Sequence, residues 1–172
     1  MTELLSNTMK YSSRKHREVN HKYDGKPYSF HLNMVYEVSL KFSYLLKEED
    51  KENVYCGCWV HDLIEDTRET YTDVLEHTNY TISELCYSLT NEKGKTRGER
   101  GNDKYYKEMH DVPNGVFIKL CDRISNVLYS NYKCSKKLLM YRKENENFVK
   151  KLFRPELKDM FDYLEGLLSE NK

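Results

Sequence analysis

The sequence predicts an all-α protein that forms a single helical bundle. Apolar residues recur at helical spacing through most of the chain, as Met34, Val38 and Phe42 do. The 172 residues suffice for one hydrophobic core, and no repeat or linker divides them. We therefore expect one domain over residues 1–172, with a short β-hairpin near the glycine-rich segment 91–108.

The first third of the chain is expected to hold two helices separated by a turn. A weakly amphipathic helix covers residues 2–20. The segment YDGKPYSF, residues 23–30, breaks the pattern, because Gly25 permits unusual dihedral angles and Pro27 favours an extended neighbourhood. A second helix covers residues 31–48 and is followed by the solvated acidic turn EEDKEN.

Three further helices are predicted in the middle of the chain. A largely buried helix, VYCGCWVHDLIEDT, covers residues 54–67. Two short helices follow at residues 68–78 and 81–90. Thr81 and Glu84 have the spacing of a capping box at the start of the second short helix.

The segment 91–108 is predicted to be a mobile loop, because three glycines interrupt it before any helix. An apolar helix then begins near Val116. The last part of the chain, residues 135–169, is amphipathic, and Pro155 fits the first turn of a terminal helix.

The composition argues against several classes of partner. The chain has 28 basic and 28 acidic residues, so no strongly basic face for nucleic acid is indicated. No apolar run is long enough to span a membrane, and the N-terminus lacks the apolar core of a signal peptide. We expect a cytoplasmic protein without nucleic-acid or membrane partners. The sequence leaves its oligomeric state open.

The five cysteines do not suggest a disulfide framework, because their number is odd and most have apolar neighbours. Cys56 and Cys58 form a C-x-C pair that could suggest a metal site. On a helix, however, two residues at this spacing point about 200° apart. We favour ordinary packing of small buried thiols over metal ligation.

The stretch WVHDLIEDT, residues 59–67, places four ionisable side chains in an apolar helix. Such groups are costly to bury unless they are paired or bind a metal. Glu65 follows His61 by one helical turn, and Asp66 follows Asp62 in the same way. Taken alone, the pair His61 and Asp62 is better explained as a satisfied polar pair in the core.

Two distant residues change that interpretation. His31 opens a helix directly after the Gly-x-Pro-Tyr turn, and Asp122 lies in the apolar helix IKLCDRISN. Together with His61 and Asp62 they would form a site of two histidines and two aspartates. Mixed nitrogen and oxygen ligands of this kind suit Mn²⁺, Fe²⁺ or Zn²⁺, with open positions for water and substrate.

The order His, His-Asp, Asp resembles the signature of the HD-domain metal phosphohydrolases, which are helical bundles. GKPYSFH, HDLIEDT and KLCDRISN closely resemble the hydrolase domain of the RelA/SpoT enzymes and the stand-alone small alarmone hydrolases. The resemblance covers about residues 14–130, and HDLIEDT is its most specific part. A chain of this length leaves no room for a downstream synthetase or regulatory domain, so we expect no bifunctional enzyme.

The resemblance implies a reaction and a set of roles. The family removes the 3′-pyrophosphate from ppGpp and pppGpp, the alarmones of the stringent response, and yields GDP or GTP. It implies a divalent metal, Mn²⁺ before other transition metals. By the same resemblance, the metal ligands are His31, His61, Asp62 and Asp122, the residues that assist the attacking water are Glu65 and Asp66, and the substrate contacts include Tyr28 and Asn126.

The chain departs from the family pattern where substrate is bound. The family usually carries an Arg-Lys pair before the Gly-x-Pro-Tyr turn, and here Lys22 and Tyr23 occupy those positions. The family's Asn-x-Arg-Thr becomes Asn126-Val127-Leu128-Tyr129. We retain Lys22 as a candidate substrate contact. These changes support phosphohydrolase chemistry more firmly than they support alarmone specificity.

The glycine-rich segment supplies candidate phosphate ligands, because arginine binds phosphate through a bidentate fork. Arg97 and Arg100 are the main candidates. Its other basic residues are Lys93, Lys95 and Lys104. Such a cluster is more often a solvated surface. The histidines outside the motif are interpreted as ordinary surface or helix-end residues: His16, His21, His77 and His110.

Three functions remain open from the sequence. The first is hydrolysis of (p)ppGpp by a metal-activated water. The second is HD-type hydrolysis of another nucleotide, such as a dNTP, a signalling nucleotide or a nicotinamide dinucleotide phosphate. The third is a nucleotide-binding protein without catalysis. The complete set of candidate ligands and carboxylates argues against the third.

Overall fold

The computed structural model describes residues 1–91 and 94–169. It is an all-α bundle with one two-stranded hairpin, as the sequence predicts. The helices are α1 (Glu3–Glu18), α2 (Ser29–Lys41), α3 (Lys51–Val60), α4 (Leu63–Asp66), α5 (Tyr71–His77), α6 (Tyr80–Leu89), α7 (Arg97–Arg100), α8 (Asp103–Asp111), α9 (Gly115–Tyr132), α10 (Lys137–Leu152) and α11 (Lys158–Ser169). The strands are β1 (Lys22–Tyr23) and β2 (Lys26–Pro27), and short 3₁₀ turns cover Ser43–Leu45, Glu48–Asp50 and Pro155–Leu157.

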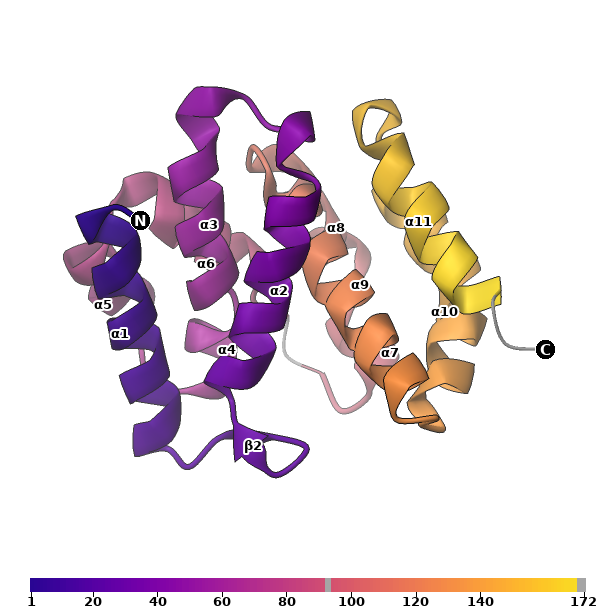
Figure 1. Cartoon of the computed structure of the whole chain (residues 1–172), viewed down its shortest axis with the longest axis horizontal. Coiled ribbons are helices and arrows are strands. Elements are labelled where there is room, and N and C mark those ends of the chain that lie inside the picture. The colour runs from indigo at the N-terminus through magenta and orange to yellow at the C-terminus, as the bar shows by residue number, and fades with distance from the viewer. Residues whose placement is uncertain (92–93, 170–172) are drawn as a thin grey trace.

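Helices α2 and α3 occupy the middle of the bundle. Helix α3 packs against α1, α2 and α6, whereas α2 also packs against α9 (Figure 1). Two groups of buried side chains result, one around α1, α3 and α6 and the other around α9, α10 and α11. Cys56 belongs to the first group and Cys58 to the second, so the C-x-C pair points to opposite sides of α3. Both cysteines are fully buried packing residues.

The predicted helix over residues 54–67 is interrupted at its ionisable pair. Helix α3 ends at Val60 and α4 begins at Leu63, so His61 and Asp62 form the turn between them. Asp62 has φ −106° and ψ 5°, outside the helical region. The apolar flanks are nevertheless buried, because Val60 and Leu63 are 0% exposed. The pair therefore sits at a helix end that is anchored on both sides.

Other boundaries differ from the prediction. The hairpin lies at residues 22–27 rather than near the glycine-rich segment, where the described residues form no strand. That segment is also more helical than expected: α7 and the start of α8 fall within it. Helix α7 begins with a capping box in which Thr96 and Glu99 satisfy each other's backbone N–H groups.

The capping box predicted at Thr81 and Glu84 is wrong. Helix α6 begins earlier, and the side chain of Asn79 accepts a hydrogen bond from the N–H of Ile82. Asparagine is a favoured N-cap, because its short side chain reaches the free N–H groups of the first turn. Glu84 instead accepts a hydrogen bond from the hydroxyl of Tyr71.

Two other elements agree better with the sequence prediction, the one at Pro155 and the helix expected from residue 31. Pro155 begins the 3₁₀ turn that leads into α11. The helix predicted from residue 31 starts at Ser29 and ends at Lys41, after which 3₁₀ turns replace it.

No helix in the described part of the chain combines the length and the apolar character that crossing a bilayer requires.

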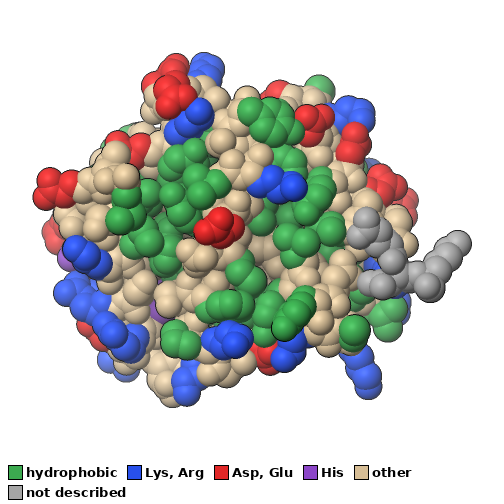
Figure 2. Space-filling model, viewed as in Figure 1, with side chains coloured by type: hydrophobic (Ala, Val, Ile, Leu, Met, Phe, Trp, Pro, Cys, Tyr) green, Lys and Arg blue, Asp and Glu red, His purple; other side chains and the backbone are tan. Residues whose placement is uncertain are grey.

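Hydrophobic side chains reach the surface in several patches on the face drawn in Figure 2, and charged side chains lie between them. The large exposed ones in the chain include Tyr44, Tyr132 and Leu139. Folded proteins leave roughly 55–60% of their surface apolar, so these residues do not by themselves define an interface.

Gly115 allows α9 to begin close to α8. A Cβ atom at this position would lie 2.6 Å from the carbonyl oxygen of Met109, which is backbone and cannot move aside cheaply. We expect Gly115→Ala to lower the free energy of unfolding by about 1–3 kcal/mol, the usual cost of overpacking. Chemical denaturation would measure it.

Gly166 provides the matched control, because a Cβ atom there meets no atom within 4 Å and the residue lies in the exposed face of α11. Gly166→Ala should stabilise the protein by about 0.5–1 kcal/mol, since alanine favours a helix over glycine. Equal effects of the two substitutions would contradict the proposed close approach at Gly115.

Candidate functional site

A cavity of about 580 Å³ opens between the hairpin, the α3–α4 turn and helices α7 to α10. This volume lies within the range of small-molecule sites, about 300–1,000 Å³. Ten of the eleven candidate residues from the sequence lie at this cavity. Nine line it: Tyr28, His31, Asp62, Glu65, Asp66, Arg97, Arg100, Asp122 and Asn126. His61 lies at its end beside His31 and Asp122, whereas Lys22 is exposed on β1 and does not line the cavity.

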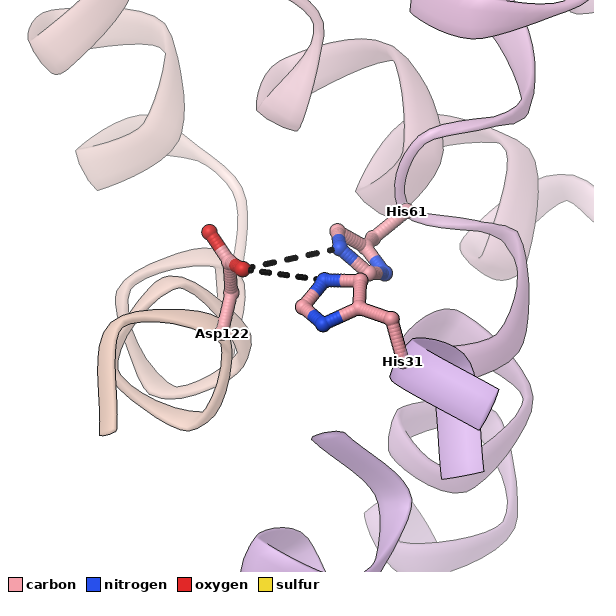
Figure 3. A group of neighbouring side chains, drawn as sticks. All are labelled: His31, His61 and Asp122. Atoms are coloured by element: carbon pink, nitrogen blue, oxygen red, sulfur yellow. Dashed lines mark ion pairs between the residues drawn. The ribbon is translucent and has the colours of Figure 1, made fainter. Parts of the chain in front are cut away.

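Three of the candidate metal ligands meet at one end of the cavity. One ligand atom each from His31, His61 and Asp122 lies within 4.8 Å of the others. Oδ1 of Asp122 is 3.3 Å from Nε2 of His31 and 3.9 Å from Nε2 of His61. Figure 3 shows both imidazole rings turned toward that oxygen, from α2 and the end of α3 toward α9.

Asp62 completes the group from the side of His61. Its Oδ2 atom is 2.9 Å from Nε2 of His61 and 3.9 Å from Nε2 of His31. The hydroxyl of Tyr28 donates a short hydrogen bond to the same oxygen. Tyr28 is the N-cap residue of α2 and is itself buried, so it fixes Asp62 from within the fold. Tyr28, expected to contact substrate, thus also orients a candidate ligand.

The ring of His61 has the orientation that a metal ligand requires. Nδ1 of His61 lies 2.9 Å from the carbonyl oxygen of Cys58, which can only accept, so Nδ1 carries the proton in the neutral ring. Nε2 is then free to present a lone pair. It is buried and forms no hydrogen bond with the described residues, despite its closeness to Asp62. A buried nitrogen in this state suits metal ligation.

The ionisable groups at this end of the cavity strongly shift one another's pKa values. Burial lowers the pKa of His61, but the Asp62 and Asp122 carboxylates outweigh it and raise the pKa to about 9. Burial also opposes ionisation of Asp122, yet Lys119, His31 and His61 hold its pKa well below the ordinary value. Two carboxylates close together in a buried site therefore require cationic neighbours.

Asp122 is held on both of its oxygens. Nζ of Lys119 lies 3.1 Å from Oδ2, and Nδ2 of Asn126 donates to Oδ1 at 2.6 Å and to the backbone oxygen of Asp122 at 3.0 Å. Both amide hydrogens of Asn126 thus go to Asp122. Asn126 lines the cavity, as expected for a substrate contact, but in this structure its donors support the candidate ligand.

Glu65 and Asp66 have different surroundings. Glu65 accepts hydrogen bonds from the backbone N–H and the side-chain amide of Asn91, at 3.1 and 2.9 Å. Asp66 is partly exposed, and burial together with the charges of Asp62 and Glu65 raises its pKa to about 7. A carboxyl group with this pKa can take up or release a proton near neutral pH.

The basic candidates divide into three groups. Arg97 makes a bidentate ion pair with Glu144, at 2.7 and 3.2 Å, and it shares this one carboxylate with Arg123, whose Nη1 lies 2.9 Å from Glu144, so the group keeps a net positive charge. Arg100 lines the cavity and makes no ion pair with the described residues. Outside the cavity lie Lys95 and Lys104, and Lys93 lies outside the described residues.

Several residues of the site escaped the sequence analysis. Lys119 lies one helical turn before Asp122, and this spacing on one helix could have revealed it. His16, expected at the surface or at a helix end, lies in the last turn of α1 but is only 1% exposed, and its Nδ1 lies 3.0 Å from Nδ1 of His21. The ring of His21 stacks on Tyr28 with centroids 3.8 Å apart. These pairs are only five and seven residues apart, but no sequence motif marks the burial of His16 or the ring contacts.

The remaining two histidines agree with the prediction. His77 lies at the end of α5, and its Nδ1 is 2.8 Å from the backbone oxygen of Asp73. His110 lies near the end of α8, and its Nε2 is 2.8 Å from the backbone oxygen of Lys151. Neither lines the cavity.

Comparison with known proteins bears out the resemblance read from the motifs. The chain is 25% identical over 127 residues to a zebrafish (Danio rerio) protein named guanosine-3′,5′-bis(diphosphate) 3′-pyrophosphohydrolase MESH1, covering 73% of this chain and 68% of the relative. It is 27% identical over 154 residues to the guanosine-3′,5′-bis(diphosphate) 3′-pyrophosphohydrolase of Aquifex aeolicus. That match covers 87% of this chain but only 20% of the bacterial protein. No protein-family model matches the chain.

A solved structure has the same fold. It is described as a metazoan orthologue of SpoT that hydrolyses ppGpp and plays a role in starvation responses. The two chains superpose with a TM-score of 0.73 over 98% of this chain and 97% of the other, at 19% sequence identity. The all-α fold with a short hairpin is therefore confirmed along almost the whole chain.

The raised pKa of Asp66 predicts a pH-dependent stability of the metal-free protein. Because Asp66 keeps its proton in the folded state up to about pH 7, whereas the unfolded chain releases it near the ordinary value of 3.8, this group lowers stability as pH rises between those values. Asp66→Asn removes the titration. The advantage of the variant in melting temperature, measured with EDTA, should therefore grow from about pH 4 to about pH 7 and level off above that.

The informative quantity is how the difference in melting temperature between Asp66→Asn and the wild type changes with pH. An advantage of Asp66→Asn that is the same at every pH would mean that Asp66 ionises normally in the fold, and that its burial beside Asp62 carries no cost.

Proposed function

We propose that this chain is a metal-dependent phosphohydrolase that removes the 3′-pyrophosphate of ppGpp and pppGpp, giving GDP or GTP and pyrophosphate. The observation that carries the proposal is the convergence of His31, His61, Asp62 and Asp122 at one end of a nucleotide-sized cavity. The curated relatives bear the name of this activity, and they match most of the chain.

The four proposed ligands fit a divalent metal. Two imidazole nitrogens and two carboxylates suit Mn²⁺, with Fe²⁺ or Zn²⁺ as alternatives. The buried Nε2 of His61 without a hydrogen bond, and the paired carboxylates, support this assignment. When bound, the metal would lower the pKa of a water molecule and offset charge on the phosphoryl oxygens.

Side chains of the protein would activate the water and bind the phosphate groups. Glu65 and Asp66 lie one turn beyond the proposed ligands and are placed to orient the attacking water and accept its proton. Arg100 and Lys143 line the basic part of the cavity and can bind phosphate oxygens. Arg97 also lines the cavity, and the guanidinium N–H groups that do not bind Glu144 can bind phosphate oxygens as well.

We further propose that residues 1–172 act as one HD phosphohydrolase domain, because the superposition with the solved relative extends over nearly all of both chains. The partner that the cavity suits is a small nucleotide. We expect no nucleic-acid partner, since the formal net charge is zero.

A second candidate is hydrolysis of a different nucleotide. Tyr23 lines the hairpin side of the cavity at a position where the resembling family usually has a basic residue. Its ring lies parallel to that of His31, with centroids 4.7 Å apart. An aromatic surface there would favour stacking over charged contacts, and stacking discriminates poorly between bases.

Turnover of a nucleotide panel tests both candidates. With Mn²⁺ and ppGpp we expect GDP and pyrophosphate, detected by mass spectrometry, and no product after EDTA treatment. Asp62→Asn should abolish turnover, and Glu65→Gln should reduce kcat by about 10²- to 10⁴-fold, the usual contribution of an acid or base. Faster hydrolysis of another nucleotide would select the second candidate.

The proposal has a clear negative outcome. If the wild type turns over no nucleotide with Mn²⁺, Fe²⁺ or Zn²⁺, while calorimetry shows that it binds one tightly, the chain is a binding protein and both hydrolase candidates fail.

Arg100 and Lys22 should differ in their effect on substrate binding. Arg100→Ala removes a charged side chain from the cavity, so we expect KM to rise by about 10- to 100-fold, from the loss of one hydrogen bond to a charged group. Lys22→Ala serves as control, because Lys22 is exposed and outside the cavity, and its KM should be unchanged. Steady-state kinetics would measure both. A larger effect at Lys22 would mean that the hairpin closes over bound substrate.

A further inference from the structure

Tyr23 is the hairpin residue most closely connected to the proposed metal ligands. Its hydroxyl donates a hydrogen bond of 2.8 Å to Oδ1 of Asn126, which lies on α9. Its ring stacks on His31, with an interplanar angle of 7°. One side chain therefore touches a proposed ligand directly and reaches a second one, Asp122, through a single intermediate.

The direction of these hydrogen bonds follows from the chemistry of the groups. The carboxylate and backbone oxygens of Asp122 only accept hydrogen bonds, so the amide nitrogen of Asn126 must face them. The amide oxygen then faces Tyr23, and the Tyr23 hydroxyl must donate. Burial and nearby Tyr141 and Asp122 raise the pKa of Tyr23, which keeps its proton in place.

We propose that Tyr23 is a positioning residue for the metal centre: through Asn126 it fixes the orientation in which Oδ1 of Asp122 faces His31 and His61. This inference rests on the proposed function, because it assumes that these residues bind a divalent metal. It assigns to Tyr23 a role that differs from contact with the nucleotide. Partners of metal ligands of this kind typically affect metal affinity or activity by about 10- to 100-fold.

The hairpin offers a matched control. Tyr129, also on α9, donates a hydrogen bond of 2.6 Å to Asp24, and Lys133 forms an ion pair with the same carboxylate at 3.2 Å. Tyr129 thus ties the hairpin to α9 as Tyr23 does, but it makes no hydrogen bond to a proposed ligand or to Asn126. Tyr23→Phe and Tyr129→Phe each remove one hydroxyl between the same two elements.

The first measurement is the binding of Mn²⁺ to metal-free protein by calorimetry, which needs no substrate. We expect Tyr23→Phe to raise the Kd for Mn²⁺ by about 10-fold. Because phenylalanine keeps the stack on His31, the melting temperature should change little. Tyr129→Phe should leave the Kd at the wild-type value. The Mn²⁺ concentration for half-maximal activity should shift with the Kd, and saturating Mn²⁺ should restore most of kcat in Tyr23→Phe.

The second measurement tests the route through Asn126 and remains decisive if Tyr23→Phe is less stable than expected. Since the hydroxyl acts only through Asn126, Tyr23→Phe should have no further effect on the Kd in an Asn126→Ala background. Independent, multiplicative effects of the two substitutions would overturn the proposal, because they would mean that Tyr23 acts by another path.

Three outcomes separate this inference from the proposed function. An unchanged Kd in Tyr23→Phe, or equal increases in Tyr23→Phe and Tyr129→Phe, would overturn the positioning role while the hydrolase proposal stands. A wild-type protein that binds none of Mn²⁺, Fe²⁺ and Zn²⁺ would instead overturn the proposed metal site itself.

Discussion

The structure depends on one electrostatic constraint: two carboxylates, Asp62 and Asp122, lie close together beside two buried histidines. Two anions so near each other are strongly unfavourable in a buried site unless cations compensate them. Lys119 supplies one positive charge, and in the absence of a metal His61 takes up a proton readily. A divalent cation would compensate both carboxylates at once, so the compensating charges seen in the protein support the proposed metal site.

This constraint accounts for the local backbone as well as for the side chains. His61 and Asp62 form the turn between α3 and α4, and both side chains lie at the end of the cavity. The flanking residues Val60 and Leu63 are fully buried, which holds the turn in place. Tyr28 and Asn126 then fix the two carboxylates from opposite sides.

The sequence predicted the parts of this arrangement that depend on local spacing. The helical periodicity predicted the all-α fold, and the motifs around His31, His61 and Asp122 predicted residues that the fold brings within 4.8 Å. It could not predict contacts between distant segments, such as the hydrogen bond between Tyr23 and Asn126, which lie 103 residues apart. Likewise, the sequence does not predict the ion pair between Arg97 and Glu144, because the two residues are 47 positions apart.

The two ends of the cavity are built from different kinds of structure, and this has a consequence for specificity. The proposed metal end is formed by α2, the end of α3 and α9, where His31 and His61 are buried and Asp122 accepts a hydrogen bond from Asn126. The basic end includes exposed residues on the short helix α7 and on α10, such as Arg100 and Lys143. Substitutions at the basic end can therefore alter which nucleotide binds without disturbing the chemistry. Tyr23 differs from the basic residues, because it lines the cavity and also supports Asp122 through Asn126. A change of substrate preference at Tyr23 would be coupled to metal affinity, whereas one at Arg100 would not.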